Sequence, residues 1–232
     1  MSTIALVHSS GQGSWCWERT RPELEKLGHQ VVTMDLPCDV GSATFDDYAD
    51  VVCDSVAHTS GDELILVGHG LAGQTIPLVA ARRPVRRLVY LCGVPAMPGQ
   101  SLAGQMSADE ILNPAYAPAL SDMDSEGRRT WVDESLARVH MYADCDEGTA
   151  HDAFSRTRPQ SILPYTLQSS LPTVPDVATA YVVCTEDRLI NPPWSRRIAR
   201  EWLDAEIVEL PGSHSPFLSR PGELAAVLDG LT

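Results

Sequence analysis

The chain has 232 residues, of which 44% are hydrophobic, and this length and composition fit one globular domain with a packed core. Its formal net charge of −14 would repel phosphate backbones and anionic lipid heads, so neither nucleic acid nor a membrane surface is an expected partner. No apolar run approaches the roughly 20 residues that span a bilayer, the six cysteines form no CxxC pair and no signal peptide opens the sequence, so we predict a cytoplasmic location.

Apolar strand-like runs alternate with amphipathic stretches along most of the chain, a pattern typical of a parallel sheet covered by helices. Gly28 fits the end of the first predicted helix. Strands are predicted at 3–8, 30–36, 63–68, 87–92, 179–184 and 205–210, and helices at 15–27, 45–58, 71–82, 194–203 and 221–231.

The alternation stops between about residues 94 and 175, where Pro, Gly, Ser, Met and Asp are frequent and helical patterns appear only at 131–141 and 148–156. An irregular insertion between two strands of a parallel sheet is typical of a cap over a substrate. A separate small domain is the weaker alternative, because the insertion is short and polar. We therefore predict one α/β domain over 1–232, with its core in about 1–93 and 176–232 and a small cap in about 94–175.

The segment 66–73 (LVGHGLAG) ends a predicted strand and opens a helix, which is the context of the nucleophile elbow G-x-S-x-G. Here Gly70 stands where that motif has serine. Glycine meets the demand for a strained, close turn, but it lacks the hydroxyl that attacks a carbonyl. A phosphate-binding turn is a weaker alternative, because neither G-x-G-x-x-G nor a P-loop lysine is present and the turn follows the third strand.

Two further residues follow strands in the order that an α/β-hydrolase triad requires. Asp187 comes after the strand at 179–184, and His214 comes after the strand at 205–210. A lone loop histidine is more often a surface residue, but the pair in this order predicts a carboxylate that orients an imidazole. Asp187 and His214 are therefore candidate catalytic residues, with Gly70 as the vacant nucleophile position.

The loop 8–15 (HSSGQGSW) joins the first strand to the first helix, where such enzymes supply an oxyanion-hole amide. The expected amide donors are Ser10 and Leu71, and Ser9 and His69 are placed in the same substrate-binding region. A plain glycine-rich helix start explains the loop equally well, and the two interpretations are compatible.

Together these pieces resemble the α/β-hydrolase superfamily, and most closely the branch of plant hydroxynitrile lyases, plant methylesterases and short bacterial relatives. The resemblance is carried by 7–17, 27–29, 34–37, the segment 66–73, 185–187 and 214–221. It implies that Asp187 is the acid, that His214 is the base and that Ser9 lies near the reacting oxygen. Ser215 stands where hydroxynitrile lyases have a lysine that handles cyanide, which argues against cyanohydrin cleavage.

Three functions stay open from the sequence. The first is a natural serine-free enzyme, in which His214 acts as general base in elimination, decarboxylation, cyclisation or water-mediated hydrolysis of a small carbonyl or ester substrate, as in natural-product metabolism. The second is a serine esterase carrying a Ser-to-Gly inactivating change. The third is a non-catalytic protein that binds small molecules.

Substrate identity depends on the cap, where Trp131, Tyr142 and Tyr165 are candidate pocket walls, although each is equally explained as ordinary cap core. No metal or cofactor is expected, because the seven histidines show no ligand spacing. A small-molecule substrate is the expected partner, and the oligomeric state is left open, a homodimer included.

Overall fold

The computed structural model describes residues 1–232 and contains a parallel sheet of six strands in the order β2-β1-β3-β4-β7-β8. All five strand pairs in this sheet are parallel. The strands are β1 (Thr3–Val7), β2 (Gln30–Thr33), β3 (Leu64–His69), β4 (Arg87–Leu91), β7 (Ala178–Cys184) and β8 (Glu206–Leu210). The predicted α/β-hydrolase arrangement of a parallel sheet flanked by helices is confirmed.

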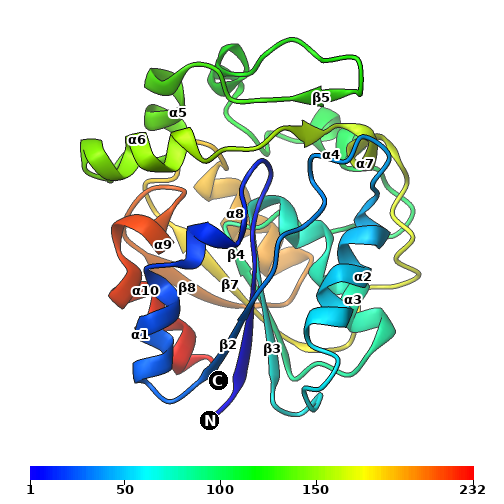
Figure 1. The fold of residues 1–232 in the computed structure, drawn as a ribbon. Coiled ribbons are helices and arrows are strands. Elements are labelled where there is room, and N and C mark those ends of the chain that lie inside the picture. Colours follow the sequence, from blue (N-terminus) through cyan, green and yellow to red (C-terminus); the bar gives the residue numbers. More distant parts are fainter.

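Helices cover both faces of the sheet (Figure 1). One face carries α1 (Thr20–Lys26), α9 (Pro216–Ser219) and α10 (Pro221–Gly230), and the other carries α2 (Phe45–Ser55), α3 (Ile76–Arg82) and α8 (Pro192–Glu201). Side chains alternate between the two faces along each strand. In β1, for example, Ile4 and Leu6 pack with one group of helices, and Ala5 and Val7 pack with the other.

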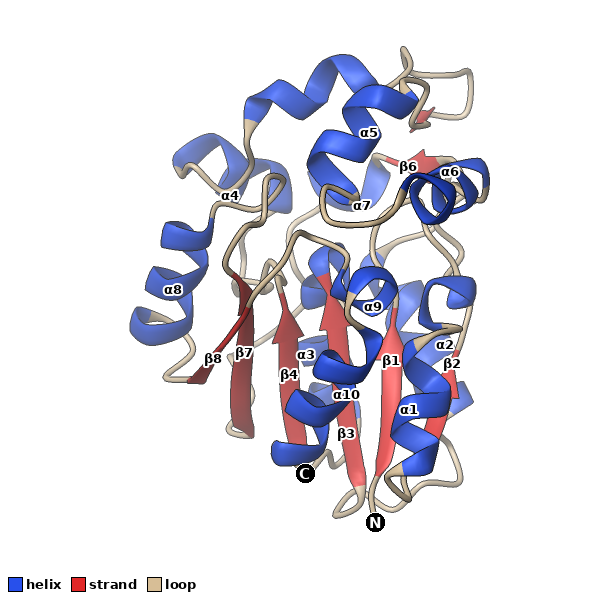
Figure 2. Cartoon of the chain, turned by 90° about the vertical axis from the view of Figure 1, so that its left-hand side faces the viewer, coloured by secondary structure: helices blue, strands red, loops and turns tan.

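The insertion between β4 and β7 lies over the carboxyl ends of the strands (Figure 2). It contains α4 (Leu102–Ala108), a 3₁₀ helix (Pro114–Ala119), β5 (Arg128–Arg129), α5 (Glu134–Met141), α6 (Glu147–Ser155), β6 (Gln160–Ser161) and α7 (Leu163–Thr166). Strands β5 and β6 pair with each other in an antiparallel manner, separately from the main sheet. Because ligands of α/β folds bind at the carboxyl ends of the strands, this segment lies where a substrate would be enclosed.

Two predicted helices are interrupted in the structure. The stretch predicted at 15–27 divides into a 3₁₀ helix (Ser14–Trp17) and α1, and the stretch at 71–82 divides into a 3₁₀ helix (Gly70–Gln74) and α3. A proline explains each break: Pro22 and Pro77 lie in the first turns of α1 and α3. In the first turn of a helix the main-chain N–H groups have no helical acceptor, so a proline, which lacks an N–H, is tolerated there. In one continuous helix each of these prolines would lie in the interior, where its N–H would be needed for a hydrogen bond.

Local signals place several helix ends as expected. Gly28 follows α1 with φ of +91°, a conformation that glycine adopts without steric penalty. Thr44 and Asp47 form a capping box at the start of α2. The helix predicted at 131–141 begins later, at Glu134, because Asp133 caps it and Trp131 forms a bridge with Leu120.

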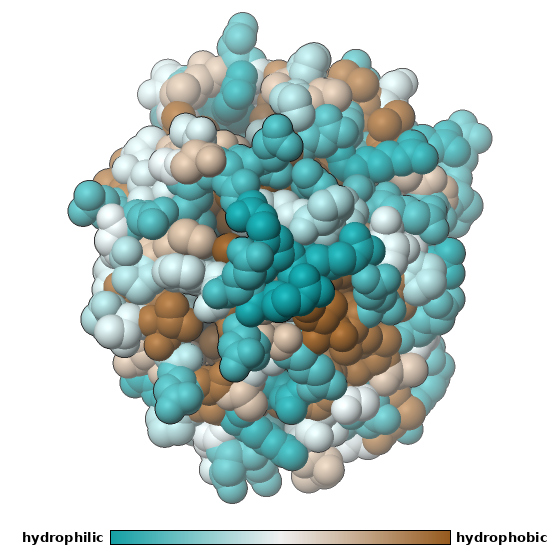
Figure 3. Space-filling model, turned by 180° about the vertical axis from the view of Figure 1, so that it is seen from behind, coloured by the Kyte–Doolittle hydropathy of each residue, from teal (hydrophilic) through white to brown (hydrophobic).

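The surface is largely hydrophilic on the rear face, where hydrophobic residues form small separate areas (Figure 3). None of the helices combines the length and the apolar character needed to cross a bilayer.

Candidate active site

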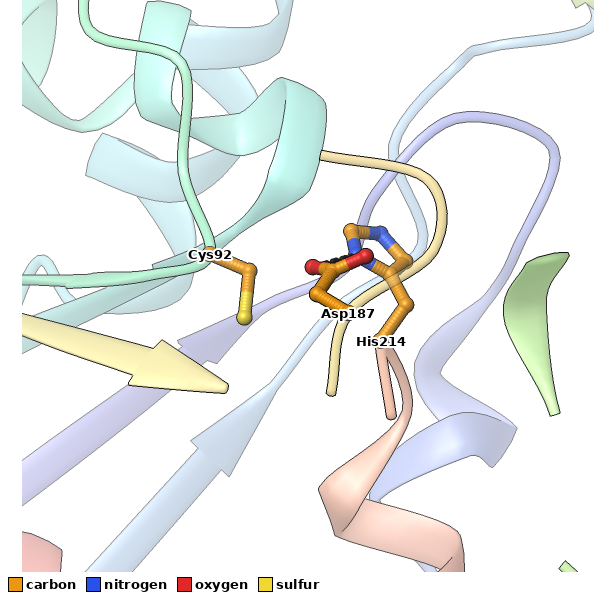
Figure 4. Close-up of side chains that lie close together, drawn as sticks. All are labelled: Cys92, Asp187 and His214. Atoms are coloured by element: carbon orange, nitrogen blue, oxygen red, sulfur yellow. Dashed lines mark hydrogen bonds and ion pairs between the residues drawn. The ribbon is translucent and has the colours of Figure 1, made fainter. Parts of the chain in front are cut away.

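The side chains of His214 and Asp187 meet at the carboxyl end of the sheet (Figure 4). Nδ1 of His214 lies 2.7 Å from Oδ2 of Asp187, and both side chains are buried. The other carboxylate oxygen, Oδ1, accepts hydrogen bonds from the amides of Leu189 at 2.8 Å and Ile190 at 2.9 Å. Two main-chain donors thus fix the carboxylate, and the carboxylate in turn fixes the imidazole ring.

This arrangement determines what His214 can do. Burial alone would lower the pKa of His214, but the charge and hydrogen bond of Asp187 outweigh it and raise the pKa to about 10. Because Nδ1 donates to Asp187, Nε2 is the nitrogen that can accept a proton from another molecule. Nε2 has no hydrogen-bond partner in the protein, and His214 lines the largest apolar cavity.

Gly70 lies at the sharp turn after β3 and has φ of +50°, in the left-handed region that favours glycine. A β-carbon built on Gly70 would lie 3.4 Å from Nε2 of His214, so the turn faces the imidazole. At Gly73 a β-carbon would come within 2.6 Å of the carbonyl oxygen of Val94, which explains the last glycine of the segment. The turn therefore has the geometry expected of a nucleophile elbow, without a side chain at its tip.

The hydroxyl of Ser9 occupies the space beside Gly70. A β-carbon at position 70 would overlap Oγ of Ser9 and lie 3.1 Å from its β-carbon. Oγ also accepts a hydrogen bond of 2.9 Å from the amide of Leu71, one of the two predicted oxyanion donors. Ser10 lines the cavity, and its amide donates to no group of the chain. One predicted donor is thus bonded to Ser9, and the other has no partner in the chain.

A cavity of about 230 Å³ extends from His214 and Gly70 to the insertion above the sheet. Of its 22 lining residues, 14 are hydrophobic, which is the composition of a site for a small, mostly apolar ligand. Trp131 and Tyr165 contribute to its walls. The hydroxyl of Tyr165 also lies 3.1 Å from Oγ of Ser10, so it ties the insertion to the loop after β1.

Two sequence expectations fail. Tyr142 does not line the cavity: its ring is buried with Met141 and Cys145 in the core on the side of α1 and α10. The sequence alone does not show in which direction an aromatic side chain at the end of a cap helix points. His69 does not line the cavity either, because its Nδ1 lies 3.2 Å from the carboxamide oxygen of Gln12 and its Nε2 lies 2.9 Å from the carbonyl of His214. His69 supports the loop that carries His214.

Cys92 lies behind the pair, at the end of β4 (Figure 4). Its sulfur and the nearest atoms of Asp187 and His214 all lie within 4.8 Å of one another. Burial raises the pKa of the Cys92 thiol well above its usual value, so its sulfur is present as the neutral thiol. Nδ1 of His214 is bonded to Asp187.

Sequence reasoning missed several residues of this region. Cys92 has φ of +46°, an unusual conformation for a residue other than glycine, and no motif announces it. Gln12 accepts a hydrogen bond from the amide of Ser9 and its carboxamide lies 3.2 Å from Nδ1 of His69, and its only signal was its place in the glycine-rich loop. Arg129 and Arg158 line the cavity from the irregular insertion, where the sequence offers no periodic pattern to orient them.

Comparison with known proteins agrees with this geometry. The family model described as "Alpha/beta hydrolase family" matches residues 4–227. Among curated proteins, Methylesterase 3 of Arabidopsis thaliana is 22% identical, with 97% of this chain and 94% of that protein covered. A pyrethroid hydrolase of Sphingobium wenxiniae is 27% identical, with 98% and 86% covered, and norfluorocurarine synthase 2 of a Strychnos species is 25% identical, with 99% and 94% covered.

Solved structures show the same fold. Polyneuridine aldehyde esterase superposes with a TM-score of 0.84 at 21% identity, with 100% of this chain and 99% of that chain covered. A pyrethroid hydrolase from Sphingobium faniae gives a TM-score of 0.85 at 22% identity, with 99% and 96% covered. With its strand order, its elbow and a family match over nearly its whole length, the chain belongs to the α/β-hydrolase family and is a hydrolase-type enzyme with esterase and methylesterase relatives.

Proposed function

We propose that this enzyme acts without a covalent serine step and uses His214, oriented by Asp187, as a general base on a small carbonyl or ester-type substrate. The observation that carries the proposal is the unpartnered Nε2 of His214, which faces the cavity beside Gly70. A substrate hydroxyl, an acidic C–H or a water molecule held there would give its proton to Nε2. Asp187 would hold the ring and stabilise the imidazolium that forms.

Two main-chain amides would stabilise the negative charge that develops on the substrate oxygen. The amide of Ser10 is free, and the amide of Leu71 becomes free when the substrate oxygen replaces the hydroxyl of Ser9. The displaced hydroxyl would remain beside the oxygen as a further donor. One such donor contributes about 10²–10³-fold and a general base about 10²–10⁴-fold, so a site without serine retains substantial catalytic power.

These parts serve elimination, cyclisation or hydrolysis by an activated water, because in each of them His214 would take a proton next to a developing oxyanion. They also serve decarboxylation, in which loss of CO2 leaves an enolate that the two amides would stabilise and the imidazolium of His214 would protonate. The relatives' names include esterases, a hydrolase and a synthase, so the family's scaffold accommodates more than one reaction. A role in natural-product metabolism and a cytoplasmic location stay predictions, as does the oligomeric state.

The packing around Gly70 argues against a serine enzyme that carries an inactivating change. Oγ of Ser9 fills the space beside Gly70 and bonds to Leu71, and its β-carbon would lie only 3.1 Å from one at position 70, so a serine there would require Ser9 to shift. A serine codon at position 70 of the natural gene would overturn this conclusion.

A purely binding protein is the second alternative. It would have no use for a buried imidazole whose free nitrogen faces the cavity, because a buried polar atom without a hydrogen-bond partner costs stability.

The test is turnover of a panel of esters, β-keto acids and β-hydroxy carbonyl compounds, followed by mass spectrometry. His214→Ala should reduce the turnover by about 10²–10⁴-fold. The exposed His58 provides the matched control, and His58→Ala should react at the wild-type rate. Equal turnover by wild type and His214→Ala, or ligand binding without any turnover, would show that the proposal is wrong.

A further inference from the structure

The cavity beside His214 is positively charged, although the chain as a whole is strongly acidic. Arg129 and Arg158 are among its lining residues, and no lining residue is an aspartate or a glutamate. The chain as a whole has a formal net charge of −14. The acidic side chains are thus kept out of the cavity wall, and a guanidinium group there that has no acidic partner would attract an anion.

Arg158 is committed to the protein itself. One of its terminal nitrogens donates to the carbonyls of Gln12 at 3.4 Å and Leu36 at 3.2 Å, and the other lies 2.6 Å from a carboxylate oxygen of Asp39. Its charge is therefore paired, and its position is explained by the contact between the insertion and the loops after β1 and β2.

Arg129 is different, because its guanidinium is oriented but not neutralised. Its Nε donates to the carbonyl of Ser121 at 2.9 Å, and neither of its two terminal nitrogens has a partner in the chain. It forms no ion pair, whereas its neighbour Arg128 pairs with Asp124 and Glu126. Successive residues of a strand point to opposite sides, so β5 directs Arg128 to the outer surface and Arg129 to the cavity.

The surroundings of Arg129 favour a flat or elongated apolar group beside the charge. Tyr116 and Trp131 line the same cavity, with ring centroids 6.1 Å apart. A guanidinium with two free nitrogens matches the two oxygens of a carboxylate, and a charge-assisted pair of this kind is stronger than a neutral hydrogen bond.

We infer that the substrate carries a carboxylate, which Arg129 binds, in addition to the carbonyl group that reacts beside His214. The substrate class is thus a small apolar acid with a second, reactive carbonyl, such as a keto acid or a half-ester. This inference rests on the proposed function only in taking the cavity beside His214 as the substrate site.

The experiment measures binding, not turnover, by titration calorimetry with pairs of probes that differ in one group. Aryl and alkyl keto acids, 4-acetylbenzoate among them, are each compared with the corresponding neutral amide. Measurements on His214→Ala show whether any preference is independent of catalysis. Arg128→Gln is the matched control, because it removes the same charge from the same strand on the outer face.

We expect the carboxylates to bind about tenfold or more tightly than their amides, a difference that falls as salt increases. Arg129→Gln should abolish the preference, Arg129→Lys should retain part of it, and Arg128→Gln should retain it fully. His214→Ala should weaken the preference without abolishing it, because it removes a second positive charge from the cavity. If no carboxylate binds more tightly than its amide, or if Arg129→Gln keeps the preference, the inference is wrong. A preference without turnover would instead contradict the proposed function alone.

Discussion

The hydroxyl of Ser9 lies in the space that a side chain at Gly70 would fill, and it bonds to the amide of Leu71. The lack of a side chain at position 70 therefore leaves the space that the Ser9 hydroxyl of the loop after β1 occupies. A serine restored at position 70 would require Oγ of Ser9 to rotate away and to give up its bond to Leu71.

This relationship predicts a dependence between two substitutions. Gly70→Ser alone should destabilise the protein by about 1–3 kcal/mol, because φ of +50° is strained for serine and Ser9 is in the way. Adding Ser9→Gly should recover part of this loss and should increase the hydrolysis of p-nitrophenyl esters. Ser9→Ala is the weaker partner, since it retains a β-carbon 3.1 Å away. Urea denaturation and ester assays test this, and additive effects of the two changes would contradict it.

A second prediction concerns the pH dependence of turnover. Asp187 raises the pKa of His214 to about 10, and a general base must be deprotonated, so kcat/KM should rise with pH up to that value. In Asp187→Asn the carboxylate no longer opposes the effect of burial, so the pKa of His214 should fall. The rising part of the pH profile should therefore move to lower pH, and the plateau of kcat/KM should be lower. A pH profile of both proteins measures this. An unchanged limb in Asp187→Asn would show that the pair does not control the reaction.

The same pKa predicts how stability changes with pH. The pKa of His214 is higher in the folded state than its ordinary value of 6.5, so the pair stabilises the fold fully below pH 6.5. That contribution decreases as the pH rises towards 10. The free energy of unfolding of wild type relative to Asp187→Asn should therefore fall between pH 6.5 and 10. A constant difference over this range would contradict the coupling between the two residues.

A control prediction lies far from the site. Thr44 caps α2 and accepts a hydrogen bond from the amide of Asp47 at 3.2 Å. Thr44→Ala should reduce the free energy of unfolding by about 1 kcal/mol and leave ligand binding unchanged. Urea denaturation and calorimetry measure the two effects, and a loss of binding would show that α2 is coupled to the cavity.

The sequence predicts the sheet because its central strands are continuous apolar runs, and it predicts the contact between Asp187 and His214 because the ends of parallel strands meet at one edge. The positions of Asp187 and His214 after two successive predicted strands were enough to predict that their side chains meet. Pro22 and Pro77 mark where two predicted helices divide, a local signal that the apolar periodicity concealed.

Other features depend on contacts between distant segments. The overlap of Ser9 and Gly70 joins residues 61 positions apart, and only the packed loops reveal it. The inward direction of Arg129 depends on the pairing of the two-residue strands β5 and β6, which carry too few residues to show a period. The prediction that Tyr142 lines the cavity was wrong because the sequence of its short helix does not show which face turns to the cavity.

Labelling with a fluorophosphonate, read by intact-protein and peptide mass spectrometry, tests the central claim most directly. We predict that the wild-type protein stays unlabelled and that the double variant Gly70→Ser/Ser9→Gly gains one adduct at position 70. Adding His214→Ala to the double variant should remove this adduct. An adduct on Ser9 of the wild type would show a covalent nucleophile where we propose none. A double variant that stays unlabelled would show that His214 and the oxyanion donors are not assembled around position 70.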